Sequence, residues 1–150
     1  MQQAQLVEAG GRLLSLEDQL RLTQAFGASS TAHFSALARM PLCGAHLILD
    51  SGADESGLGV DTQVFNASEV LDEAFNVYPG KLAQAHGLVP FGMCLEGSGD
   101  PYFVALNDGG IVRIPHDAAR GGELRLAAIE RIAESVEAFV ARATSGADVP

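Results

Sequence analysis

The sequence predicts an α+β fold: a single domain with a twisted, largely antiparallel sheet of about five or six strands and helices packed mainly on one side. Short runs rich in Val, Ile, Phe and Tyr, separated by Gly, Asn, Asp and Pro, fill residues 88–116 and indicate strands joined by tight turns. Apolar residues at helical spacing flank that stretch. The chain has 150 residues, so we expect residues 1–150 to form one domain.

The first part of the chain predicts helices that pack on another element. Residues 1–14 predict a weak helix, and we expect this segment and residues 145–150 to fray. Ser15 can cap a stronger helix with Asp18 at its third position, and residues 29–31 can cap another one that ends at Pro41. We expect the helix that Ser15 caps to stop at Gly27. Apolar residues in and just before this helix lie near one face: Leu13, Leu16, Leu20 and Ala25.

The middle of the chain predicts two strands followed by a helix. Residues 45–49 are an apolar run, and residues 60–65 alternate between apolar and polar side chains as a half-buried strand does. A loop rich in Gly, Ser and acids, residues 50–59, joins them. Asn66 can then cap a helix, with Glu69 three residues on, that ends before Pro79.

A three-stranded antiparallel meander is expected from residues 88–93, 102–106 and 111–114. We expect Gly97, Gly99 and Gly110 to lie in turns, at least two of them with positive φ. The Gly97–Asp100 stretch is followed by no Lys, so it predicts a turn in which Asp100 accepts backbone N–H bonds rather than a phosphate site. Strand alternation turns only one of Tyr102 and Phe103 inward, and the Tyr hydroxyl favours Phe103. We therefore expect one core that contains Phe91, Phe103, Ile111, Val136 and Phe139.

Several motifs in this region resemble those of the SUKH superfamily, which includes fungal cell-wall assembly regulators and many bacterial immunity proteins. In order, they are PFG at 90–92, GSGDPYF at 97–103, DGGIV at 108–112, HD at 116–117 and IAESVEAFV at 132–140. The similarity covers residues 79–143, and the N-terminal helix motif of that family is absent. The positions that match the family motifs, which we expect to be structural, are Gly92, Gly97, Gly99, Asp100, Phe103, Gly110, His116, Ser135 and Phe139.

The resemblance also bears on residues 124–143. Their periodicity alone fits one long helix, whereas the resemblance implies a strand near residues 124–132 and a helix capped by Ser135. We favour the second arrangement. The resemblance further implies a non-catalytic, protein-binding domain without a cofactor, used in bacteria as an immunity protein that binds and neutralises a toxin.

Charge gives an independent indication of the partner. The chain has nineteen acids against nine bases, a net charge of −10. Nucleic acids and anionic membranes attract the opposite sign, so a basic protein is the expected partner, and solubility alone is the alternative explanation. An acid-rich stretch without Lys or Arg forms the predicted contact surface: Asp50, Asp54, Glu55, Asp61, Glu69, Asp72 and Glu73.

The remaining candidate chemistry is weaker. Cys43 and Cys94 suit free thiols in a reducing cytoplasm, and neither a secretory signal nor an apolar run of about 20 residues is found. The histidines have no metal-ligand spacing. Two rival functions remain open. One is a constitutive scaffold or regulatory module, which predicts an apolar surface patch. The other is a small cysteine-dependent hydrolase that uses Cys94 with His86 or His116 and Asp100.

Overall fold

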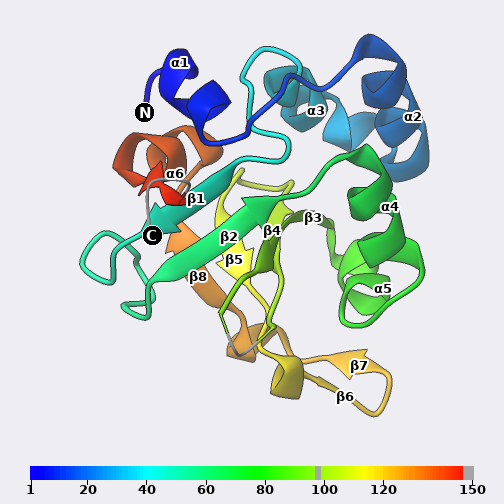
Figure 1. Cartoon of the computed structure of the whole chain (residues 1–150). Helices are drawn as coiled ribbons and strands as arrows, with labels where there is room; N and C mark the ends of the chain where they lie inside the picture. The colour runs from blue at the N-terminus through cyan, green and yellow to red at the C-terminus, as the bar shows by residue number, and fades with distance from the viewer. Residues whose placement is uncertain (97–98, 147–150) are drawn as a thin grey trace.

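The protein has the expected α+β fold, built on one curled antiparallel sheet (Figure 1). The structure is a computed structural model and describes residues 1–96 and 99–146. The sheet has seven strands in the order β8-β5-β4-β3-β2-β1-β9, and a separate hairpin pairs β6 with β7. The strands are β1 (His46–Leu49), β2 (Val60–Val64), β3 (Leu88–Cys94), β4 (Tyr102–Ala105), β5 (Ile111–Arg113), β6 (Ala119–Arg120), β7 (Glu123–Leu124), β8 (Glu130–Ala133) and β9 (Thr144–Ser145).

The helices cover mainly one face of this sheet, and three begin where the sequence predicts caps. They are α1 (Gln3–Glu8), α2 (Leu16–Phe26), α3 (Thr31–Leu37), α4 (Ala67–Phe75), α5 (Gly80–Ala83) and α6 (Val136–Arg142). The Ser15 hydroxyl accepts the Asp18 N–H at 3.1 Å, and Asn66 and Glu69 form a reciprocal capping box. Ser135 caps α6 in the same way, which confirms the strand-then-helix arrangement of the C-terminal region.

The meander is confirmed, and both of its faces are covered. Tyr102 packs with Phe91 and Phe139 on the face that α1, α2, α3, α4 and α6 cover. Phe103 points to the opposite face, into a smaller cluster under α5 and the β6-β7 hairpin. The expected core was therefore wrong for Phe103, although this ring is fully buried. Alternation places neighbouring side chains on opposite faces, and here a second cluster buries the other face as well.

The expectation of positive φ at two or more of the three glycines is tested at Gly99 and Gly110. Gly99 has positive φ, but in the next turn it is Gly109 (φ 79°), and not Gly110, that adopts the left-handed conformation; Gly97 lies outside the described residues. Gly110 has a different constraint, because a Cβ there would lie 2.8 Å from the Arg131 guanidinium.

The leucines of α2 are the second correction. Leu16 and Leu20 are 70% and 63% exposed, whereas Leu22 is buried. Phe26, on the inward side, packs beside Phe34 and Phe75 with ring centroids 5.7 and 5.6 Å away. The helix therefore docks through a face that the sequence pattern did not single out.

The N-terminal segment, which we expected to fray, is attached to the rest of the structure. Leu6 is 1% exposed, and the N-terminal amine donates to the Val140 carbonyl at 2.9 Å. Arg12 and Cys43 exchange backbone hydrogen bonds in an isolated β-bridge. These contacts hold α1 beside α6 and β9.

Gly92 allows β3 to approach β2 closely, and this generates the first prediction. The pairing of β3 with β4 shifts between Pro90 and Gly92. A Cβ at Gly92 would lie 2.3 Å from the Thr62 hydroxyl oxygen, which donates to the Met93 carbonyl at 2.7 Å. Gly92→Ala should therefore lower the free energy of unfolding by about 1–3 kcal/mol, because overpacking displaces Thr62 and breaks that bond.

Urea denaturation measures this loss, with Gly52→Ala as the matched control. Gly52 is exposed, and an added Cβ would meet no atom within 4 Å. We expect the control to unfold as the wild type does or at a slightly higher urea concentration. Equal stability of the two variants would show that β3 tolerates a side chain at position 92.

Candidate functional site

The seven acids predicted as a contact surface are divided among a loop, a strand and a helix. Asp50, Asp54 and Glu55 lie in the loop after β1, and Glu69, Asp72 and Glu73 lie on α4. The loop and the helix are at opposite ends of β2, which carries Asp61 (Figure 1). The stretch is continuous in sequence, but a strand of extended backbone separates its two halves in space.

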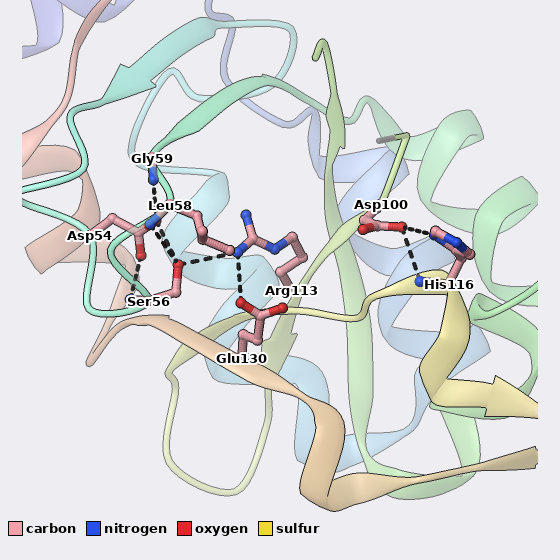
Figure 2. A network of polar contacts seen from close by, with 8 residues as sticks. All are labelled: Asp54, Ser56, Leu58, Gly59, Asp100, Arg113, His116 and Glu130. Carbon is pink, nitrogen blue, oxygen red and sulfur yellow. Dashed lines mark hydrogen bonds and ion pairs between the residues drawn. The ribbon is translucent and has the colours of Figure 1, made fainter. Parts of the chain in front are cut away.

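Asp54 is a structural anchor of the loop. It is only 5% exposed, and its carboxylate accepts hydrogen bonds from the Ser56 N–H and hydroxyl, both at 2.8 Å, and from the Gly59 N–H at 2.9 Å (Figure 2). These bonds satisfy the carboxylate within the loop. The spacing Asp-x-Ser-x-x-Gly is the signal that sequence reasoning missed, because Asp side chains that bind backbone two residues on are common in turns.

A buried arginine connects this loop to the sheet. Arg113 on β5 is 6% exposed and donates to the Ser56 hydroxyl at 3.2 Å and to the Glu130 carboxylate at 2.8 Å (Figure 2). The Tyr102 hydroxyl lies beside it and beside Cys94, and burial raises the pKa of Tyr102 well above its usual value. The Glu130 carboxylate thus compensates the buried charge of Arg113, and the two hydrogen bonds of Arg113 link the loop to strands β5 and β8.

Asp61 has its own partner. Its carboxylate lies 2.5 Å from Nε2 of His46 on the neighbouring strand, and both side chains are about one third exposed. The backbone of Gly146 covers the imidazole ring, since a Cβ on that glycine would lie 2.4 Å from it. The pair spans β1 and β2 on the face of the sheet opposite the main core.

The three acids of α4 line an open hollow of about 590 Å³. Asp72 and Glu73 lie three and four residues after Glu69, so all three point to one side of the helix. Burial, with a contribution from the Asp72 charge, raises the pKa of Glu73. The described residues around the hollow include no Lys or Arg: Phe65, Asn66, Ser68, Glu69, Asp72, Glu73, Met93, Cys94, Gly99 and Pro101.

The three α4 acids differ in the hydrogen bonds that their carboxylates accept. Glu69 is occupied by the capping box, and Asp72 accepts the Asn76 amide N–H at 2.9 Å. Glu73 is partly buried, and in the part of the chain that the structure describes no hydrogen bond to its carboxylate is found. A cation bound in the hollow would therefore stabilise the charged form of Glu73 more than that of Glu69 or Asp72.

Asp100 and His116, two of the motif residues, contact each other. The Asp100 carboxylate accepts the His116 backbone N–H at 3.0 Å and lies 3.1 Å from its Nδ1 (Figure 2). This confirms Asp100 as an acceptor of a backbone N–H bond. The His116 ring contacts this carboxylate and is 83% exposed. The pair fastens the turn before β4 to the segment that follows β5.

The two cysteines are not joined in a disulfide and lie in different settings. Cys43 is buried, and burial raises its pKa to about 11. Cys94 is partly exposed at the end of β3, where its Sγ lies 3.7 Å from the Glu96 carbonyl and beside Tyr102. Across residues 1–96 and 99–146, no cluster of three His, Cys, Asp or Glu side chains suited to a metal ion occurs. The helices of the same ranges include none long and apolar enough to cross a membrane.

His33 on α3 presents a buried nitrogen without a partner. Its Nε2 is shielded from solvent and makes no hydrogen bond with any described residue. The residue borders a cavity of about 250 Å³ into which the β4-β5 turn and the start of α6 also project. Burial lowers the pKa of His33 to about 4. Asp108 and Glu137 border the same cavity.

This burial predicts a specific acid sensitivity. The pKa of His33 is depressed in the folded state, so the unfolded chain binds the proton more readily. The stability that the neutral ring contributes is complete above about pH 6.5 and declines as the pH falls toward 4. His33→Leu should flatten the fall in unfolding temperature between pH 6.5 and pH 4.

Melting curves of the wild type and His33→Leu at several pH values test this, with His86→Gln as control. His86 is exposed, and its loss should leave the pH dependence unchanged. If His33→Leu loses stability with acid as steeply as the wild type, the imidazole is not the group that senses acid.

The contrast between Asp54 and Glu55 gives another prediction. Asp54→Ala removes three hydrogen bonds and leaves the partly buried N–H groups of Ser56 and Gly59 without this acceptor, so it should cost about 2–3 kcal/mol. Glu55→Ala removes an exposed charge, while its backbone N–H bond to Ile132 remains, so the change should stay within about 0.5 kcal/mol. Urea denaturation of both variants measures the difference, and equal stability would contradict the anchoring role of Asp54.

Comparisons with known proteins give no assignment. No protein-family model matches the chain, and no curated protein matches it. The similarity of its motifs to the SUKH superfamily therefore stays a prediction from the sequence.

Proposed function

We propose that this protein is a non-catalytic, protein-binding domain that acts as an immunity protein and neutralises a basic toxin domain by binding it. The observation that carries the proposal is the acidic hollow on α4, where Glu69, Asp72 and Glu73 converge beside an opening without a neighbouring base among the described residues. The motif resemblance supplies the immunity role, and the hollow supplies a place for basic side chains.

The electrostatics of the hollow favour a cationic partner. Glu73 is partly buried next to Asp72, and its raised pKa shows that the charged form is disfavoured there. A Lys or Arg side chain entering the hollow would stabilise that charge and donate hydrogen bonds to the carboxylates. Arg suits the site best, because its planar guanidinium can bind two carboxylate oxygens at once.

The charge of the whole molecule supports the same partner. A net charge of −10 attracts a basic domain over a distance and can raise its association rate toward about 10⁸–10⁹ M⁻¹s⁻¹. Fast capture suits an inhibitor that must reach a toxin before the toxin acts. Asp54 and Asp61 are committed to contacts within the protein, so we assign the contact to the α4 acids, with the exposed Asp50 and Glu55 acting on encounter only.

The test is binding to a basic toxin domain encoded next to the gene for this protein, measured over a range of salt concentrations. The triple variant Glu69→Gln, Asp72→Asn, Glu73→Gln keeps side-chain shape and the capping oxygen of Glu69. It should weaken binding about 30-fold or more and flatten the salt dependence, since truncating one partner of a buried charge pair costs about 2–5 kcal/mol.

A control variant removes the same number of charges elsewhere: Glu8→Gln, Glu123→Gln and Glu137→Gln, all at exposed positions. It should lower the association rate slightly and leave the dissociation rate unchanged. If the α4 variant binds with wild-type affinity and salt dependence, the hollow is not the contact. If the wild-type protein binds no such domain, the immunity function is wrong.

A further inference from the structure

Helix α2 carries an apolar stripe on its outer side. Leu16 and Leu20 are 70% and 63% exposed and lie one turn apart on one face, and Leu13, just before the cap, is 55% exposed. Single exposed leucines are ordinary, but several together on one helix indicate an interaction surface. The buried side of α2 uses Leu22 and Phe26 instead, so folding does not require the stripe.

Opposite charges flank the stripe at the same spacing. Glu17 follows Leu16, and Arg21 follows Leu20, so the two charged side chains lie one turn apart on one flank of the leucines. Both residues are exposed. Arg21 lies 3.4 Å from Asp18, and such a long, exposed ion pair is easily exchanged for another partner.

This pattern is complementary to itself. When two α2 helices lie antiparallel about a two-fold axis near residues 18–19, Leu16 of each copy faces Leu20 of the other. The same rotation sets Glu17 of each copy opposite Arg21 of the other, so two ion pairs form on the flank that carries these charges. We propose that the outer face of α2 is the contact between two copies of this chain in a symmetric dimer.

Charge argues against a basic protein as the partner on this surface. A basic partner would meet Arg21 on this face, whereas a second copy satisfies Glu17 and Arg21 together. The net charge of −10 repels two copies at long range, but at 0.15 M salt that repulsion is screened beyond about 8 Å. One helix crossing buries less than the roughly 800 Å² per partner of standard interfaces, so the dimer should dissociate in the micromolar range or above. The α4 hollow shares no residue with this surface.

The first measurement is sedimentation velocity at about 0.15 M salt, over protein concentrations from about 10 μM to about 1 mM. This range spans the dissociation constant expected for so small an interface. The wild type should shift from monomer to dimer across this range. Leu16→Gln with Leu20→Gln should remain monomeric. A control pair at scattered exposed leucines, Leu58→Gln with Leu126→Gln, should dimerise as the wild type does. A monomeric wild type at the highest concentration, or an unchanged dimer in the α2 variant, would overturn the proposal.

Charge reversal tests the geometry itself. Glu17→Arg gives each copy two cations on this flank, and Arg21→Glu gives each copy two anions. Like charges then face each other across the dimer, so each variant alone should dimerise at least about tenfold more weakly. The antiparallel arrangement sets the cations of one variant against the anions of the other, so an equimolar mixture should recover dimerisation. A mixture that associates no better than its separate components would overturn the antiparallel contact.

Discussion

The pairing of the buried Arg113 guanidinium is the interaction on which the joining of the β1-β2 loop to edge strand β8 depends. Burying a charge costs several kcal/mol unless close partners compensate it, and here Glu130 and Ser56 do so at 2.8 and 3.2 Å. Glu130 belongs to the edge strand β8, and Ser56 belongs to the loop after β1. The loop backbone also bonds to β8 through Glu55 N–H and the Ile132 carbonyl. The loop therefore covers one exposed edge of the sheet, where unpaired backbone groups invite aggregation.

Features encoded over a few residues could be predicted from the sequence. Strand limits in the meander follow from turn residues beside β-branched and aromatic runs, and helix starts follow from Ser15, Asn66 and Ser135, whose side chains bind backbone N–H groups three residues on. The pairing of Asp100 with His116 needs the whole meander to form, because sixteen residues separate them. The motif order indicated that both were structural, but not that they contact each other.

Features that depend on what packs against a face could not be predicted in this way. Alternation shows that Tyr102 and Phe103 point apart, and it is silent on whether one sheet face or both are covered. Helical spacing likewise identifies Leu16 and Leu20 as a stripe without telling whether the core or solvent meets it. In each case the missing quantity is the position of a distant element, which local periodicity does not contain.

Counting acids has the same weakness, since it treats each carboxylate as an equal surface charge. Asp54 and Asp61 are compensated within the protein, one by loop N–H groups and a hydroxyl, the other by His46. Such carboxylates stabilise the fold and say little about a partner. Glu73 differs, because burial and its acidic neighbour Asp72 both disfavour its charge. A carboxylate that lowers stability on its own is the one that a cationic partner would stabilise most, so the acids of α4 are more informative about function than the net charge of the chain.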